Sequence, residues 1–186
     1  MGIDYERLKA WSFEDQLTTY SRKDSMLYAL GLGYGQDPLN SEELTFVFED
    51  GLQAVPSMLT VLGAPGAWAS DPRTGIDWMR ILHGEHRMTV HGTLPPEGCL
   101  RSRTRVSSIV DKGEGRGALV ITTREVSDEA SGKPIATIDH TSFCRSDGGF
   151  GGGDPVPSSL PAVPDAPADT TVNLQTAQGA ALLYRL

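Results

Sequence analysis

The chain has 186 residues, of which 39% are hydrophobic and 22% charged, and its formal net charge is −8. This composition is typical of one globular domain with or without a tail, and it excludes disordered and fibrous classes. The acidic balance argues against sequence-independent nucleic-acid binding, because phosphate contacts require a basic face. No apolar run approaches the roughly 18 residues of a membrane span.

The termini and the cysteines indicate a cellular compartment. Acidic Asp4 and Glu6 occupy the place of a basic signal-peptide segment, so we expect no secretory signal. Cys99 and Cys144 are too few for a disulfide scaffold and lack metal-ligand spacing. We therefore expect a reduced, cytoplasmic location.

A change of composition at Asp147 divides the chain. Residues 1–146 form the predicted domain, and 147–169 form a Gly/Pro-rich linker, flexible first and then extended, that carries five of the 12 prolines. Residues 170–186 turn helical and are predicted to start a second domain. The apolar stripe of this last segment comprises Leu174, Ala177, Ala181 and Leu182.

The first half of the domain is predicted to be mainly helical. Ser21 and Asp24 form a capping box for a helix that runs through Leu30 and ends in a glycine-rich stretch. Aromatic and β-branched residues predict a short strand over 44–48. Pro56 precedes an apolar helix from Ser57 to about Leu62, which is expected to be buried.

The second half of the domain is predicted to be a sheet. Four candidate strands, separated by turn-forming residues, predict an antiparallel meander: 79–91, 99–111, 117–127 and 135–144. The fold class is therefore α+β. An antiparallel sheet wrapped around a central helix is a hot-dog fold, which is one of two or three α+β arrangements that fit the pattern.

A histidine-containing segment in the first of these strands is a candidate for chemistry. On a regular strand His83 and Glu85 share one face and His86 lies on the other, which argues against a metal site that uses both histidines. Two interpretations remain open. The segment is either an ordinary polar strand face, or a ligand groove lined by His83 and Gly84.

Basic residues in the next strand and turn allow two interpretations as well. Arg101, Arg103 and Arg105 alternate onto one face, which is typical of a solvated sheet and which could also meet phosphates. Lys112 is either a turn lysine or a point charge for a phosphate. No nucleophile elbow, phosphate-binding loop or metalloprotease motif is present in the sequence.

Several segments together resemble the N-terminal half of hydratase 2, the (R)-specific 2-enoyl-CoA hydratase of the MaoC-like family. This is also the hydratase part of multifunctional β-oxidation enzyme type 2. The segments occur in family order and cover nearly the whole chain: 28–33, 44–49, 82–85, 110–115, 148–152 and 180–186.

The resemblance implies a fold, a ligand and partners. The fold would be the N-terminal half of a double hot dog, and the partners would be an acyl-CoA thioester and a second hot-dog half, with no cofactor and no metal. The positions that contact substrate in the family match His83, Gly84 and Lys112. Glu49 is a weak candidate for a functional carboxylate, because a structural role explains it equally well.

The resemblance also limits the activity expected of these residues. In the family, the stretch matched by 184–186 is followed by a Ser-Gly-Asp-x-Asn-Pro-Leu-His run, whose Asp and His activate water. That run is not within the 186 residues, so we expect them to be inactive alone. Two alternatives remain: a non-catalytic acyl-CoA-binding or scaffolding subunit, and a less favoured hot-dog thioesterase that uses Glu49 or Asp139.

Overall fold

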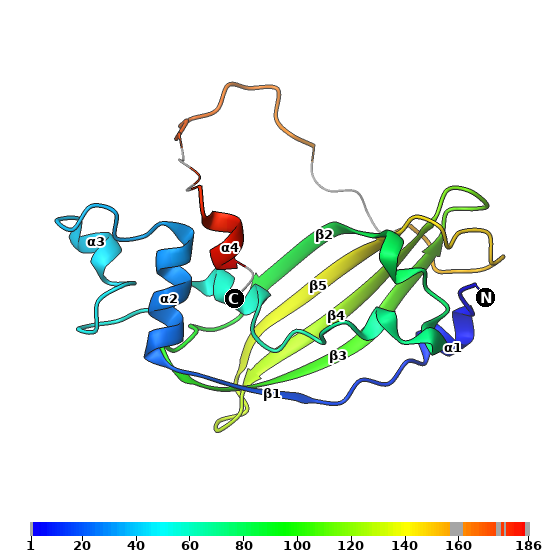
Figure 1. Ribbon diagram of the computed structural model, residues 1–186, viewed down its shortest axis with the longest axis horizontal. Helices are drawn as coiled ribbons and strands as arrows, with labels where there is room; N and C mark the ends of the chain where they lie inside the picture. Colours follow the sequence, from blue (N-terminus) through cyan, green and yellow to red (C-terminus); the bar gives the residue numbers. More distant parts are fainter. Residues whose placement is uncertain (1, 157–161, 174–175, 177, 185–186) are drawn as a thin grey trace.

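The computed structural model describes residues 2–156, 162–173, 176 and 178–184 (Figure 1). The helices are α1 (Tyr5–Lys9), α2 (Arg22–Leu32), α3 (Ser41–Leu44), the 3₁₀ helices η1 (Pro56–Thr60), η2 (Trp68–Ser70), η3 (Pro72–Thr74) and η4 (Trp78–Arg80), and α4 (Ala180–Tyr184). The strands are β1 (Gln16–Tyr20), β2 (Ile81–Val90), β3 (Gly98–Asp111), β4 (Ala118–Asp128) and β5 (Pro134–Cys144). Within the described residues, no helix is both long and apolar enough to cross a membrane.

One antiparallel sheet forms the body of the molecule, with the strand order β1-β3-β4-β5-β2 (Figure 1). The four predicted strands are all present. The meander is correct only for β3, β4 and β5, because β2 pairs with β5 at one edge instead of with β3. The unpredicted strand β1 occupies the place beside β3.

The connection between β2 and β3 explains why these strands do not form a hairpin. The Tyr20 hydroxyl donates to the Pro95 carbonyl at 2.7 Å, and the Ser25 hydroxyl donates to the Pro96 carbonyl at 2.7 Å. These bonds hold the connection at α2 and at β1, which is the edge strand opposite β2. The prolines therefore belong to a crossover connection and not to a tight turn.

A short helix lies against the inner face of the sheet. Met58 and Leu59 of η1 are 4% and 0% exposed, and they belong to the same core cluster as Leu100, Val126 and Ile138. The predicted helix is present as a 3₁₀ helix of five residues that ends at Thr60, and its predicted burial is correct except at Val61, which is 45% exposed. Pro56 starts it, and Gly63 adopts a positive φ of 65° soon after its end, which prevents a longer helix.

The predicted strand over 44–48 is wrong. The Asn40 side chain caps α3 by accepting from the backbone N–H groups of Glu42 and Glu43, and turns follow the helix. The Phe48 N–H donates to the Leu44 carbonyl at 2.9 Å. Backbone groups in this segment are thus hydrogen-bonded locally. Aromatic and β-branched residues do not form a strand here, because no neighbouring strand among the described residues is present to pair with them.

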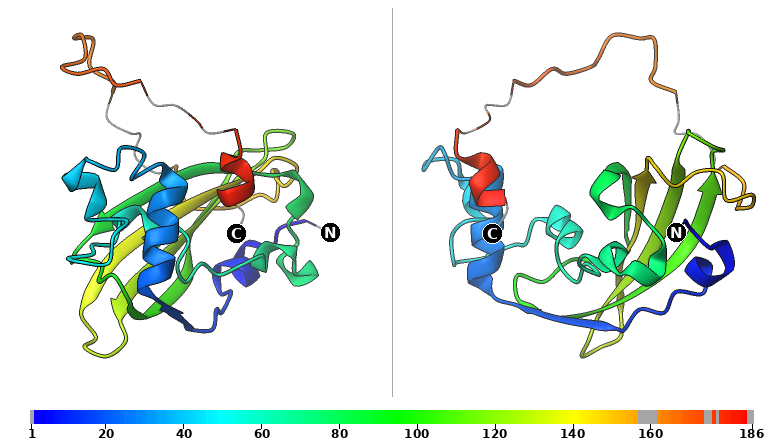
Figure 2. Two further views of the ribbon diagram at one scale, coloured as in Figure 1. Left: turned by 60° about the vertical axis from the view of Figure 1, so that its left-hand side comes forward. Right: turned by 45° about the vertical axis from the view of Figure 1, so that its right-hand side comes forward.

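The capping box of α2 forms as predicted, with Gly33 in the left-handed conformation at its end. Among the described residues of 170–186, helix is present at α4, and 170–173 are not helical. Leu174 and Ala177 of the expected stripe lie outside the described residues. The side chain of Leu183 in α4 packs against Gly31 of α2, and the two helices lie side by side (Figure 2).

The glycine-rich segment that follows β5 is attached to β3. The Asp111 carboxylate accepts from the N–H groups of Gly149 and Gly151, at 2.7 and 2.9 Å. Asp154 accepts from the Ile109 N–H at 2.9 Å and from the Lys9 ammonium at 2.6 Å. These bonds therefore hold the first part of the predicted linker, up to Asp154, against the sheet.

Candidate functional site

A pocket of about 390 Å³ lies between the inner face of the sheet and the chain that follows η1. Its walls come from four strands and from the segment around η2. The side chains that supply its polar and aromatic character are Trp68, Trp78, His83, His86, Thr104, Thr122, Arg124, His140 and Ser142. Among the described residues, no Asp or Glu lines it.

Three histidines converge in this pocket. The ring centroids of His83 and His140 are 4.8 Å apart, those of His86 and His140 are 5.8 Å apart, and those of His83 and His86 are 6.0 Å apart. The prediction that His83 and His86 lie on opposite faces is therefore wrong.

A β-bulge in β2 is the physical reason. His83 pairs with Ser142 and Glu85 pairs with Thr141, so Gly84 has no partner residue of its own in β5. The additional residue shifts the alternation of faces by one position. Glu85 and Arg87 then form an ion pair with each other, away from the histidines. A glycine inside a strand pattern is a known signal for a bulge, and it could have indicated this arrangement.

Burial determines the protonation of two of the rings. Burial, followed by repulsion from His83, His86 and Arg124, lowers the pKa of His140 to about 4. Burial, followed by Arg124 and His83, also lowers the pKa of His86. Both rings are therefore neutral at pH 7, and the Nε2 atom of His86 is buried without a hydrogen-bond partner.

Arg124 is a buried cation on the same wall of the pocket, with 5% of its surface exposed. Its guanidinium donates to the carbonyls of Leu62 and Leu59, both at 2.7 Å, and to that of Thr60 at 3.3 Å. Burial lowers its pKa to about 10. These bonds satisfy carbonyls at the end of η1, so Arg124 fixes the helix to the sheet while giving the pocket a positive charge. Sequence patterning alone did not identify this residue.

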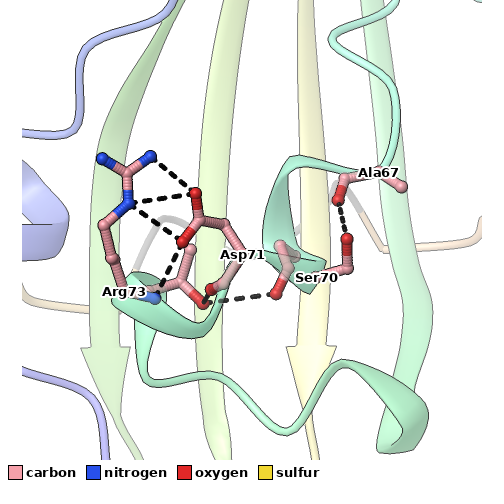
Figure 3. Close-up of polar contacts among 6 residues, drawn as sticks. Ala67, Ser70, Asp71 and Arg73 are labelled. Carbon is pink, nitrogen blue, oxygen red and sulfur yellow. Dashed lines mark hydrogen bonds and ion pairs between the residues drawn. The ribbon is translucent and has the colours of Figure 1, made fainter.

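Short polar contacts hold the segment 67–73, in which Ala67 and Ser70 line the rim of the pocket (Figure 3). The Ser70 hydroxyl donates to the Ala67 carbonyl at 2.7 Å. Asp71 and Arg73 form a two-pronged pair, with nitrogen-to-oxygen distances of 3.0 and 2.6 Å. Arg73 also lies over the ring of Trp11, 5.3 Å from its centroid. The rim is therefore preorganised by bonds within η2 and η3 and by a contact with the N-terminal segment.

The structure does not place the other predicted site residues in the pocket. Gly84 is at the bulge beside His83, where an added Cβ would lie 3.0 Å from the Thr141 carbonyl oxygen. Lys112 is exposed on the outer face of the sheet, with its ammonium 4.9 Å from the ring centroid of Phe143. Glu49 is exposed beside α2, where its backbone carbonyl accepts from Arg22.

Two of the three arginines in the row on β3, Arg101 and Arg103, are paired with carboxylates. Arg101 donates to both oxygens of Glu129 at 2.6 Å and to Asp15 at 2.9 Å, and Arg103 donates to Asp15 at 3.1 Å. The hydrogen bonds to Glu129 and Asp15 raise the pKa of Arg101. Because carboxylates already pair with Arg101 and Arg103, these two arginines do not require a phosphate as a partner.

Comparison with known proteins identifies relatives of this chain. It is 34% identical over 173 residues to an enoyl-CoA hydratase, ChsH3, of Mycobacterium tuberculosis, which covers 90% of this chain and 59% of that protein. It is 32% identical over 189 residues to 3-hydroxyacyl-thioester dehydratase Y of the same organism, covering 100% of this chain and 63% of that protein. The chain thus spans about three-fifths of the length of these relatives.

Solved structures agree with the sequence comparison. A MaoC-like dehydratase from Phytophthora capsici has a TM-score of 0.77 at 26% identity and covers 98% of this chain and 63% of its own. The full-length peroxisomal multifunctional enzyme type 2 of Drosophila melanogaster has a TM-score of 0.69 at 26% identity, covering 92% of this chain and 29% of its own. The α+β hot-dog fold is thereby confirmed. Residues 18–146 match the family described as MFE-2 hydratase 2 N-terminal domain, and the chain therefore belongs to that family.

Proposed function

We propose that this chain is the acyl-CoA-binding half of an (R)-specific 2-enoyl-CoA hydratase, which interconverts trans-2-enoyl-CoA and (3R)-hydroxyacyl-CoA. The observation that carries the proposal is the pocket at His83 on the inner face of a hydratase 2 N-terminal domain. Its volume of about 390 Å³ is within the usual range for small-molecule sites. Relatives named as an enoyl-CoA hydratase and a 3-hydroxyacyl-thioester dehydratase support this chemistry.

The chemistry of the pocket determines which catalytic groups we assign to this chain and which to a second hot-dog half. Hydration of an enoyl thioester requires donors on the thioester oxygen, a base for water and an acid for the α-carbon. Imidazole, hydroxyl and guanidinium groups can serve as donors, but no carboxylate lines the described pocket. The acid and base are therefore assigned to a second hot-dog half that carries the Ser-Gly-Asp run.

We place the two ends of the ligand on different faces of the sheet. The acyl thioester would occupy the pocket beside His83 and Gly84, and the phosphate-bearing end would extend to Lys112. Because Lys112 lies over Phe143 on the outer face, the ligand must pass over the end of the sheet where β5 ends. A flexible lysine ammonium is a suitable point charge for a phosphate at that place.

The second half is proposed to pair with the edge of the sheet that β2 forms, opposite the edge formed by β1. Strand β2 is an edge strand, and Leu82 and Val90 on it are 50% and 45% exposed. An unpaired, partly apolar edge is a common site for strand pairing with another chain or domain. The partner is either in the same longer protein, in a second copy or in a separate subunit. The cytoplasmic location remains a prediction.

The proposal is tested with a saturated ligand that cannot be hydrated. We expect decanoyl-CoA to bind the purified chain in calorimetry, His83→Ala to weaken binding at least about tenfold, and Lys112→Ala to reduce the dependence of binding on salt concentration. His91→Ala is the matched control, because His91 is outside the pocket and contacts Thr137. Absence of binding by the unmodified chain would refute the proposal.

A turnover assay separates the alternatives. With trans-2-decenoyl-CoA we expect no useful hydration by the 186 residues alone, and hydration after addition of a hot-dog domain that carries the Ser-Gly-Asp run. If His83→Ala leaves the rate of that pair unchanged, the chain is a scaffolding subunit, a function that the absence of pocket carboxylates also permits. Release of coenzyme A by the chain alone would indicate a thioesterase instead.

A further inference from the structure

Three of the four histidines of the chain form one cluster, and nothing in the proposed hydratase chemistry requires all three. One potential ligand nitrogen from each of His83, His86 and His140 lies within 4.8 Å of the others. The fourth, His91, is five residues beyond His86, roughly 16 Å away along a strand, and its Nε2 is 2.8 Å from the Thr137 hydroxyl.

The cluster is built by backbone geometry and not by flexible side chains alone. The bulge at Gly84 turns His83 and His86 to the same face, and His86 is the register partner of His140 in the adjacent strand. Two strands thus hold the three imidazoles on the inner face of the sheet. Such positioning by strands is more rigid than a cluster assembled from loops.

One of the three rings lacks the bond that its burial requires. The Nε2 atom of His86 is buried without a hydrogen-bond partner, and so is the Oγ1 atom of Thr104, which lines the same pocket. Buried polar atoms are nearly always satisfied in folded proteins, so these two atoms are available to bind an ion, a water or another ligand. An ion bound to His86, with a water or hydroxide that accepts from Thr104, would satisfy both.

From this arrangement we propose that His83, His86 and His140 form a binding site for a divalent transition-metal ion of the zinc class, with a fourth position open to the pocket. Neutral imidazole is the common protein ligand of such ions, and three histidines with an open position are an established zinc arrangement. Zn–N bonds of about 2.0–2.1 Å place the nitrogens roughly 3.4 Å apart. Because the nitrogens lie within 4.8 Å of one another, the rings must converge by up to about 1.4 Å, which rotation of one exposed and two partly exposed side chains permits.

The electrostatics of the pocket define what the fourth ligand would be. Arg124 lies in the same pocket, and among the described residues no carboxylate lines it to balance a dication. An anion in the open position, such as hydroxide, would reduce the repulsion between the metal and the guanidinium. The site is consequently expected to be weaker than a zinc site that contains a carboxylate ligand.

The test is a titration of the metal-stripped chain with Zn²⁺ in competition with a chromogenic chelator. We expect one ion per chain, and at least about 100-fold weaker binding in His86→Asn and in His140→Asn, since loss of a metal ligand exceeds the effect of an outer-sphere change. His91→Asn is expected to bind like the unmodified chain. Equal affinity in all variants, or less than half an ion per chain in the unmodified protein, would overturn the proposal.

A second measurement does not depend on how the variants fold. In NMR spectra of the unmodified chain, substoichiometric Co²⁺ is expected to broaden the imidazole resonances of His83, His86 and His140, while those of His91 stay sharp. Broadening of His91 alone, or of all four to the same extent, would contradict a site at the cluster.

Discussion

His86 and His140 stand directly opposite each other in the β2–β5 ladder, and the planes of their rings are inclined by 76°. His83 joins them only because Gly84 is inserted between it and the regular part of the strand. The position of His83 in the pocket therefore depends on a single backbone irregularity.

Substitution of the bulge glycine is expected to destabilise the sheet. In Gly84→Val the new Cβ would lie 3.0 Å from the Thr141 carbonyl oxygen and 3.3 Å from Thr141 Cγ2, so Thr141 must give by a few tenths of an ångström. We expect a loss of about 1–3 kcal/mol in the free energy of unfolding, the usual cost of overpacking, measured by urea denaturation. Gly152→Val is the control, because an added Cβ there has no neighbour within 4 Å. Similar losses in both variants would contradict the bulge argument.

Removal of the buried arginine is expected to release η1. In Arg124→Met the carbonyls of Leu59 and Leu62 lose their donors while remaining in a buried environment. The expected loss is about 3 kcal/mol, because unsatisfied buried acceptors cost about 1–3 kcal/mol each. The measurement is the urea midpoint, with Arg105→Met, an exposed position on the outer face, expected to change stability by less than about 0.5 kcal/mol. A small effect at Arg124 would show that η1 is held by its apolar contacts alone.

The attachment of the glycine-rich segment is expected to be sensitive to acid. The hydrogen bond from Lys9, followed by that from the Ile109 N–H, lowers the pKa of Asp154 to about 2 from its ordinary 3.8. A carboxyl whose pKa is lower in the folded state stabilises the fold above its unfolded pKa, and this contribution is lost as pH falls toward 2. Asp154→Asn should therefore lower the urea midpoint at pH 7, and the difference from the unmodified chain should narrow between pH 4 and pH 2.

The control for this prediction is Asp165→Asn, at an exposed position, which should have the same urea midpoint as the unmodified chain throughout. If the urea midpoints of Asp154→Asn and the unmodified chain differ by the same amount from pH 7 to pH 2, the effect is due to packing and not to the charge of Asp154.

The two cysteines are expected to differ in reactivity. Cys144 is 0% exposed, and burial raises the pKa of its thiol to about 12, whereas Cys99 is partly exposed. Because the thiolate is the reactive form, a thiol-reactive dye should label one cysteine rapidly in the native chain and both in urea. Cys99→Ser should abolish the rapid phase. Rapid labelling of two thiols in the native state would show that the core around Cys144 opens readily.

Much of the fold could be predicted because its signals are local. The capping residues Ser21 and Asp24 and the glycine at position 33 determine where α2 begins and ends. Alternating residues between turn-forming stretches predict strands over most of 81–144. The same reasoning predicted a strand over 44–48 wrongly, because strand formation requires a neighbouring strand that the local sequence does not specify.

The sequence by itself determined four of the five strands of the sheet (β2 to β5), the cap of α2 and the family resemblance, since these depend on neighbouring residues or on their order along the chain. The tertiary structure alone decided the edge at which β2 pairs, the burial of Arg124 beneath η1 and the meeting of three histidines. A bulge is a mismatch between two paired strands, so the face that His83 occupies is a property of β2 and β5 together.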